Sequence, residues 1–186
     1  KTSVTNSNLS QPIIKLIKQS GLPIDELITP ALSDLSQLFT VEPGSDEMVD
    51  LGFTVDAPKL APKAEEEMLA LVNQERIKVG IAPVKMDESL RDLARKHSLD
   101  MFQRGYFSHY TPEGKDPFDR MEEHKITYLA AGENLALAPT VDMAHTGLMN
   151  SPGHKRNILD PKYHKLGIGA YKDPRYGIMF SQEFTN

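Results

Sequence analysis

The stretch from Phe107 to His154 decides how this chain can be interpreted, because it holds three short polar clusters in otherwise ordinary sequence. The clusters are Phe107-Ser108-His109, Gly132-Glu133-Asn134 and Asn150-Ser151-Pro152-Gly153-His154. Two imidazoles and a carboxylate are groups that bind transition metals or transfer protons near neutral pH. The Gly, Ser and Pro residues in and around the clusters indicate turns or the ends of elements. The wide spacing matches no local metal-binding motif, so only the fold can bring the three clusters together.

Composition excludes several classes of protein. The 186 residues allow one core of usual size plus an appendage, and the apolar fraction of 39% is typical of a globular chain. With 21 basic and 26 acidic residues the net charge is −5, which argues against a general nucleic-acid or anionic-membrane surface. No apolar run approaches the roughly 18 residues that cross a bilayer. We therefore expect a globular protein that binds no nucleic acid and has no transmembrane segment.

The sequence contains no cysteine, which excludes disulfides, thiolate zinc sites and cysteine nucleophiles. This absence does not settle the compartment, because exported domains of this size can fold on a hydrophobic core alone. The first residues, Lys1-Thr2-Ser3-Val4, lack the apolar segment of a signal peptide. We therefore expect that any export signal has been removed or was never present.

The first 60 residues differ in texture from the rest of the chain. Proline followed by apolar residues predicts a short helix from Pro12 to about Lys18, and a second short helix is predicted from Ala31 to Phe39. Turn-forming residues at 43–45 and a run rich in Pro and Ala at 57–62 indicate a turn and an exposed linker. We interpret the segment as an exported stalk or spacer with two amphipathic helices. The alternative is a partner-docking helical hairpin, for which the sequence offers no direct support.

Two amphipathic helices are predicted next. The first covers residues 63–79 and ends at Gly80, and its apolar stripe is formed by Met68, Leu71, Val72 and Val79. The second follows Asp87, a credible N-cap, and ends at Gly105. Its apolar residues recur at helical spacing, and they are Leu90, Leu93, Ala94, His97 and Met101. Because His97 falls on this stripe, we expect a buried, hydrogen-bonded histidine rather than a ligand.

The C-terminal part changes its period. A helix is predicted over residues 141–149, just before the third polar cluster. Apolar residues then alternate over 166–170 and again over 178–184, with turn residues at 173–177 between them, which predicts a β-hairpin. Helices first and a hairpin last, without alternation of strand and helix, favour an α+β domain or an α-β-α layered domain.

Several consecutive motifs carry a family resemblance. In chain order they are Leu71-Val72-Asn73-Gln74-Glu75-Arg76, Ala94 to Met101, Phe107-Ser108-His109, Gly132 to Ala136, Asn150 to Leu159 and Leu166-Gly167-Ile168-Gly169. Together they resemble the bacterial branch of the CAP superfamily, which groups cysteine-rich secretory, antigen 5 and pathogenesis-related (SCP-like) proteins. The resemblance covers Ala64 to Phe184. It implies an α-β-α sandwich with a small antiparallel central sheet, usually exported, over residues 61–186, with residues 1–60 as an N-terminal extension.

The resemblance also assigns residues to the family's cleft. His109, Glu133 and His154 match its two histidines and its glutamate. The second acidic residue of the eukaryotic members would fall at about Ser151 and is missing, and the Trp that usually precedes this segment is replaced by Leu148. Gln182 matches a polar position on the last strand that can reach the cleft.

Three interpretations of the cleft residues stay open. His109, Glu133 and His154 can form a weak Zn²⁺ site with water in the fourth position. They can form a catalytic centre in which Glu133 or a histidine is the general base. They can also form a hydrogen-bonded network that only fixes the fold. Ser151, Asn134 and Gln182 are the candidate residues for contacts to a polar ligand.

The function that we expect is that of an exported CAP-domain binding module, with an unidentified extracellular or cell-envelope ligand. A metal-assisted, peptidase-like hydrolase that uses Glu133 and both cleft histidines is the alternative.

Overall fold

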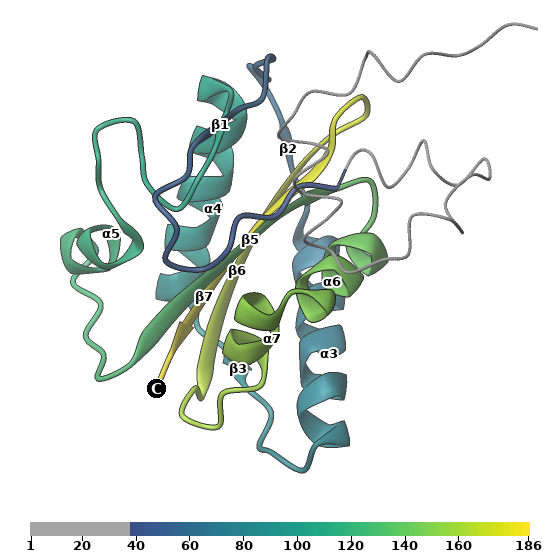
Figure 1. Ribbon diagram of the computed structural model, residues 1–186, viewed down its shortest axis with the longest axis vertical. Coiled ribbons are helices and arrows are strands. Elements are labelled where there is room, and N and C mark those ends of the chain that lie inside the picture. Colours follow the sequence, from purple (N-terminus) through teal and green to yellow (C-terminus); the bar gives the residue numbers. More distant parts are fainter. Residues whose placement is uncertain (1–37) are drawn as a thin grey trace, which may run out of the picture.

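A five-stranded sheet lies at the centre of the computed structural model, which describes residues 38–186 (Figure 1). Its three long strands are antiparallel neighbours in the order β6-β7-β5, with the bounds Lys165–Asp173 for β6, Gly177–Thr185 for β7 and Ala131–Ala138 for β5. Two short strands, β2 (Lys59–Leu60) and β3 (Lys85–Met86), pair with opposite ends of β6. The β6–β7 hairpin is the one that the alternating residues predict.

Helices cover both faces of this sheet (Figure 1). One face is covered by α4 (Glu88–Arg104), with the short helix α5 (Pro117–Glu123) beside it. On the other face lie α3 (Pro62–Lys78), α6 (Val141–Asn150) and α7 (Pro152–Ile158). A separate two-stranded ladder joins β1 (Val49–Asp50) to β4 (Tyr106–Phe107), which follows α4. This arrangement confirms the predicted α-β-α sandwich with a small antiparallel sheet.

The alternation of side chains along β5 divides the core between the two faces. Leu135 and Leu137 pack toward α4 in one apolar cluster, whereas Ala136 and Ala138 lie in the larger cluster against α3, α6 and α7. Because the period is two, Glu133 falls on the α4 face and the neighbouring Asn134 on the opposite one. The strand that carries the second polar motif thus sends its side chains to both sides of the sheet.

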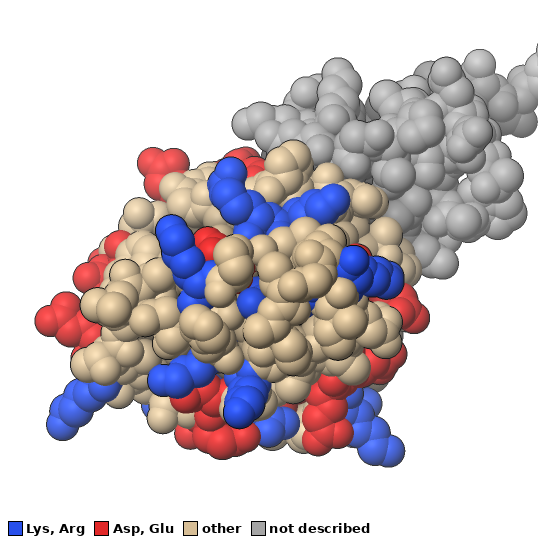
Figure 2. All heavy atoms as spheres, turned by 90° about the horizontal axis from the view of Figure 1, so that it is seen from below, with Lys and Arg blue, Asp and Glu red and all other residues tan. Residues whose placement is uncertain are grey.

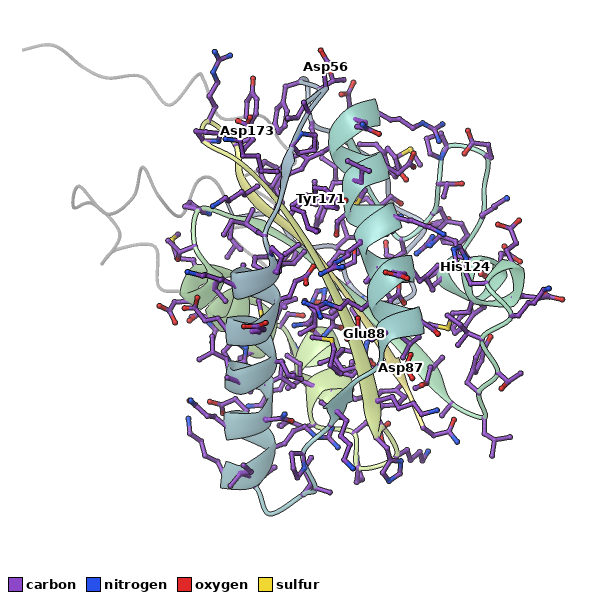
Figure 3. The ribbon with its side chains drawn as sticks, turned by 180° about the vertical axis from the view of Figure 1, so that it is seen from behind. Asp56, Asp87, Glu88, His124, Tyr171 and Asp173 are labelled. Carbon is purple, nitrogen blue, oxygen red and sulfur yellow. The ribbon has the colours of Figure 1, made fainter. Side chains whose placement is uncertain are left out.

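Helix α4 has the ends that the sequence predicts. The Asp87 carboxylate accepts from the backbone N–H groups of Ser89 (3.0 Å) and Leu90 (3.1 Å), and Gly105 closes the helix with φ of +71°. Figure 3 shows Asp87 beside the first turn of α4. All five residues of the predicted stripe are buried, namely Leu90, Leu93, Ala94, His97 and Met101. For α3 the stripe is correct at Met68 and Val72, but Val79 is exposed because it lies past the last helical residue.

Two buried charged residues of α3 were not singled out by the sequence. Arg76 donates hydrogen bonds of 2.8–2.9 Å to the backbone carbonyls of Ala82, Ile158, Asp160 and Tyr163. Glu65 pairs with Arg91 and Arg95 of α4, so the two helices are joined around the edge of β6. Burial opposes ionisation of Glu65, yet the hydrogen bonds from the two arginines lower its pKa.

Part of the expected N-terminal extension packs on the domain. Val41 and Val55 are buried in the same apolar cluster as Leu135, and the backbone N–H of Leu51 donates to the Gly105 carbonyl at 2.9 Å. The expected linker also differs, because residues 59 and 60 form β2 and the N–H of Ala61 bonds to β6. The division of the chain into an extension of residues 1–60 and a domain of residues 61–186 remains a prediction.

The expected turn at 43–45 is present. The N–H of Ser45 donates to the Glu42 carbonyl at 3.0 Å, with Pro43 and a Gly44 of φ +80° in the middle, which are the residues that a type II turn requires. The first predicted helix lies outside the described residues. So does most of the second, of which Leu38 and Phe39 are described, and Phe39 forms an isolated antiparallel bridge with Leu137 of β5.

The contact between α4 and β6 depends on glycine. A Cβ atom on Gly169 would lie 2.1 Å from the backbone nitrogen of Arg95 and 2.2 Å from the carbonyl carbon of Ala94. We predict that Gly169→Ala lowers the free energy of unfolding by about 3 kcal/mol, the upper end of the usual cost of overpacking. Urea unfolding followed by circular dichroism measures this change.

Gly80→Ala is the matched control, because its Cβ would meet no atom within 4 Å and its φ of +77° alone opposes the change. The control should cost only about 1–2 kcal/mol. Equal costs at the two positions would show that α4 does not rest on the backbone of β6.

Candidate functional site

The three polar clusters meet beside β5, the edge strand of the sheet. Glu133 lies in β5 itself, His109 lies in the loop after β4, and His154 lies in the first turn of α7. All three side chains are buried among residues 38–186. The fold therefore brings together the residues that the sequence selected from separate parts of the chain.

Both cleft imidazoles point at the same oxygen atom. The Nε2 atom of His109 lies 3.0 Å from the carbonyl oxygen of Val41, and the Nε2 atom of His154 lies 2.8 Å from it. Val41 belongs to residues 38–43, which we call the strap, and in Figure 1 this dark blue segment lies against β5. The pair of histidines thus forms a two-pronged contact to a single hydrogen-bond acceptor.

Glu133 contacts His109 at Nδ1, the ring nitrogen that faces away from Val41. Its Oε1 atom lies 2.7 Å from Nδ1 of His109. Its Oε2 atom accepts a hydrogen bond of 2.5 Å from the Arg120 guanidinium of α5, with which it forms an ion pair. Burial alone would raise the pKa of Glu133, but the Arg120 guanidinium, His97 and His109 hold it below its usual range. Glu133 is therefore an ionised residue whose two oxygens are both engaged.

Two hydrogen-bond acceptors face the ring of His109. Its Nδ1 atom faces the Glu133 carboxylate and its Nε2 atom faces the Val41 carbonyl, and both of these groups are acceptors. His109 is therefore held between two acceptors, one at each ring nitrogen, and these contacts fix the orientation of its ring.

His154 is held by a hydroxyl instead of a carboxylate. Its Nδ1 atom lies 2.6 Å from the Ser151 hydroxyl, which also lies within hydrogen-bond reach of the Glu42 carboxylate. Burial lowers the pKa of His154 to about 4, so the ring is neutral at pH 7. The expected ligand residue Ser151 thus orients a histidine and contacts the strap.

Asn134 and Gln182 form a polar layer on the other side of β5. The Asn134 amide donates to the His154 carbonyl at 3.2 Å and to the Gln182 side chain at 3.0 Å. Asn157 of α7 donates to the Asn134 side chain at 2.9 Å and to the Glu133 carbonyl at 3.1 Å. These amides tie α7 to the sheet, and their part in binding a ligand stays a prediction.

His97 has the buried position that its helical spacing predicts. Its Nε2 atom lies 2.9 Å from the Ser108 carbonyl and 4.0 Å from Glu133, and Nδ1 has no hydrogen-bond partner among residues 38–186. Burial lowers the pKa of His97 to about 4. It therefore supports the loop that carries His109 while remaining uncharged at pH 7.

Four residues of the site were missed by sequence reasoning. They are Val41 and Glu42 of the strap, Arg120 of α5 and Glu183 of β7. Glu183 lies opposite Glu133 in the β5–β7 register, 3.9 Å from the Arg120 guanidinium, and its buried carboxyl has no hydrogen-bond partner in the described part of the chain. Burial and the Glu133 charge raise its pKa well above its usual range. No local motif marks any of the four.

The fit of these residues to a divalent metal is partial. Two imidazole nitrogens converge on one point, and Glu133 on the far nitrogen of His109 is the support that metal-bound histidines usually have. Glu133 itself does not reach that point, because Arg120 and His109 occupy its oxygens. Within residues 38–186, no group of three or more His, Cys, Asp or Glu side chains is arranged to hold a metal ion.

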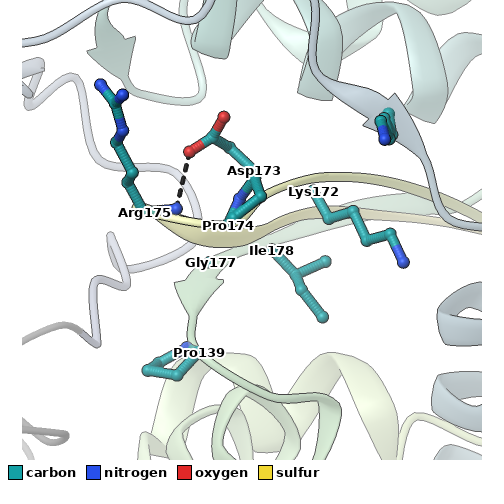
Figure 4. Close-up of a pocket in the computed structure, with 8 residues that line it drawn as sticks. Pro139, Lys172, Asp173, Pro174, Arg175, Gly177 and Ile178 are labelled. Atoms are coloured by element: carbon teal, nitrogen blue, oxygen red, sulfur yellow. Dashed lines mark hydrogen bonds between the residues drawn. The ribbon is translucent and has the colours of Figure 1, made fainter.

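The other surface features lie away from these residues. A pocket at the tip of the β6–β7 hairpin contains none of the cleft residues (Figure 4), and it is lined by Lys59, Pro139, Lys172, Asp173, Pro174, Arg175, Gly177 and Ile178. Basic and acidic side chains are interspersed on the face seen in Figure 2. No helix within residues 38–186 is long and apolar enough to cross a membrane.

The fold and the paired histidines define a class of protein, an α-β-α domain with two buried histidines beside the edge strand of its sheet. Residues 69–184 match the cysteine-rich secretory protein (CAP) family. The sequence is 30% identical to YkwD of Bacillus subtilis over 98% of this chain and 74% of YkwD. It is 35% identical to the membrane protein YlbC of the same organism over 68% of this chain, but this spans only 35% of YlbC. The chain belongs to the CAP family.

Solved structures agree with this assignment. An extracellular protein of Bacillus anthracis that contains an SCP domain aligns with a TM-score of 0.62 and 29% identity, covering 67% of this chain and 41% of that protein. An outer surface protein of Borrelia burgdorferi aligns with a TM-score of 0.65 over 70% of this chain and 98% of its own length. At 17% identity, the second likeness shows the fold alone. The bacterial type of the domain, expected from the motifs, is confirmed.

We predict that His97→Ala lowers the free energy of unfolding at pH 7 by about 1–3 kcal/mol, because the Ser108 carbonyl loses its buried partner. The pKa of His97 is lower in the folded chain, so between about pH 6.5 and about pH 4 the unfolded chain binds a proton that the folded chain does not. Stability therefore falls with falling pH in this window. In the variant, the slope of the free energy of unfolding against pH should be smaller by about 1.4 kcal/mol per pH unit, which corresponds to one proton.

Urea titrations at several pH values measure both effects. His164→Ala is the matched control, because His164 is exposed, and it should leave the stability and its pH dependence unchanged. An unchanged pH dependence in His97→Ala would show that His97 is not buried in its neutral form.

Proposed function

We propose that this CAP-domain protein is an exported binding module and that His109 and His154 form its ligand-binding centre. The observation that carries the proposal is the convergence of both Nε2 atoms on one acceptor oxygen. Two buried donors aimed at one point are costly unless an acceptor occupies that point. A fixed pair of this kind suits recognition of a ligand oxygen.

Export is supported by the relatives. The SCP-domain protein of Bacillus anthracis is described as extracellular, and the Borrelia burgdorferi protein as an outer surface protein. An extracellular or cell-envelope ligand is therefore the class that we propose.

A divalent metal is a second candidate ligand, favoured by the Glu133 contact to the far nitrogen of His109. His109 and His154 would supply two nitrogen ligands, and the metal would act as a Lewis acid toward a bound oxygen. Because Glu133 is engaged with Arg120, it would orient His109 rather than bind the ion. Such a site would be weak.

The hydrolase alternative has less support. A general base needs a free oxygen or nitrogen within reach of the substrate proton. Both oxygens of Glu133 are bound by cationic or N–H donors, and its lowered pKa makes it a poor proton acceptor. Binding without turnover is therefore the function that the geometry supports best.

We predict that Zn²⁺ binds the full chain with a dissociation constant in the micromolar range, about −8 kcal/mol. Two nitrogen ligands without a thiolate hold zinc far less tightly than a closed structural site. Isothermal titration calorimetry at pH 7.5 measures the affinity. His109→Ala and His154→Ala should each abolish the heat, whereas His164→Ala, at an exposed position, should not. If the wild-type chain gives no heat, the metal candidate fails.

We also predict that casein and peptidoglycan remain intact on incubation with the protein and zinc, as measured by gel electrophoresis and by release of soluble fragments. Turnover of either substrate that is lost in Glu133→Gln would overturn the choice of a binding module. Glu47→Gln, at an exposed glutamate, is the control for the amide substitution.

A further inference from the structure

We infer that the cleft is a groove for an extended peptide, and that residues 38–43 of this chain, the strap, are its resident occupant. The inference rests on the proposed function and deepens it, because it names the ligand class and the group that the two histidines recognise. The strap makes backbone, apolar and charged contacts, each of which a peptide from another molecule can reproduce.

The first contact is strand addition to the edge of the sheet. The Phe39 N–H donates to the Leu137 carbonyl at 2.8 Å, and the Leu137 N–H donates back to the Phe39 carbonyl at 3.0 Å. An edge strand offers such groups to any extended chain, and proteins commonly bind peptides in this way. The contact depends on the backbone and thus not on the identity of the side chains.

The second contact is the carbonyl held by the histidines. Val41 lies two residues beyond Phe39, and its carbonyl oxygen receives the Nε2 atoms of both His109 and His154. Every residue has this carbonyl, so the histidine pair recognises a peptide bond at a fixed distance from the strand bridge. The pair therefore sets the register of the bound chain.

Side chains give the groove its sequence preference. Val41 is 3% exposed and packs with the apolar cluster of the α4 face, and Phe39 lies 6.4 Å from Phe107 between ring centroids. On the opposite side the Glu42 carboxylate reaches the Ser151 hydroxyl. The groove should therefore prefer a peptide with four consecutive residues of this kind: an aromatic residue, any residue, a β-branched residue and an acidic residue.

The strap fits the groove closely and then leaves it. A Cβ atom on Gly153 of α7 would lie 2.1 Å from a carboxylate oxygen of Glu42 and 2.9 Å from Pro43, so this glycine leaves room for the occupant. The type II turn that begins at Glu42 directs the following residues away toward β1. Within the described residues 38–186, the segment that needs to detach to open the groove is short, namely residues 38–43.

Occupancy by the strap makes the groove self-inhibited. A segment tethered through a short connection competes at an effective concentration in the millimolar range, so a free peptide must outcompete it. A peptide with the strap's own sequence should then bind poorly to the wild-type chain and well to a chain whose strap is expelled.

The test uses the full chain carrying Val41→Asp and Glu42→Ala, the release variant. The new carboxylate cannot be buried without a partner, so the strap should leave the groove while the groove itself is unchanged. The probe is a fluorescein-labelled peptide with the sequence of residues 38–44, Leu-Phe-Thr-Val-Glu-Pro-Gly. Fluorescence anisotropy should show at least tenfold tighter binding to the release variant than to the wild-type chain.

Three controls make the result specific. Met48→Asp with Glu47→Ala makes the same kinds of substitution at exposed positions past the turn, and it should bind the peptide as weakly as the wild-type chain does. A peptide that carries the two release substitutions should not bind the release variant. Adding His154→Ala to the release variant should weaken binding of the original peptide about tenfold, the loss expected for one hydrogen bond.

Amide hydrogen exchange gives a second readout. The Leu137 N–H should be protected in the wild-type chain and should exchange at least tenfold faster in the release variant. If the release variant does not fold, the milder pair Phe39→Ala and Glu42→Ala takes its place in both measurements.

A folded release variant that does not bind the peptide, or a wild-type chain that binds it equally well, would overturn the peptide groove. Zinc binding that still depends on His109 and His154 would leave the proposed function standing in that case. Loss of both zinc and peptide binding would remove the two together.

Discussion

One buried carboxylate, that of Glu133, determines how the cleft is built. A carboxylate taken out of water must be paired and hydrogen-bonded, or it costs several kcal/mol. Arg120 of α5 and His109 of the loop after β4 supply the partners, and Arg120 also donates to the His109 carbonyl at 2.7 Å. Satisfying this single group therefore fixes a short helix, a loop and the edge strand relative to one another.

The charge balance around this carboxylate involves a second buried acid. Glu183 sits across the ladder from Glu133, and one guanidinium, that of Arg120, faces both. Two ionised carboxylates beside one cation would leave an unpaired buried charge. Arg120 is closer to Glu133, at 2.5 Å against 3.9 Å, so Glu133 is the ionised member and Glu183 keeps its proton. Glu133 then contacts His109 at Nδ1 and so orients the Nε2 atom of this ring toward the Val41 carbonyl.

Sequence reasoning predicted what is local in this fold and missed what is not. The N-cap Asp87, the helix-ending Gly105 and the β6–β7 hairpin follow from short patterns, because turn geometry and hydrophobic period are written within a few residues. Of the site, His109, Glu133 and His154 were found because chemistry-bearing residues stand beside turn residues and match a family. Arg120 and Val41 were missed for a physical reason. The partner of a buried charge is set by tertiary packing, and a backbone carbonyl can belong to any residue.

The strap joins the stability of the fold to the chemistry of the cleft. Without it, Leu137 would leave its edge N–H and carbonyl unpaired, and two buried Nε2 atoms would lose their acceptor. The strap also brings the Glu42 carboxylate to the Ser151 hydroxyl. A free ligand must replace all of these contacts at once. Selectivity for an extended peptide with an acid after its held carbonyl follows from that requirement rather than from any one residue.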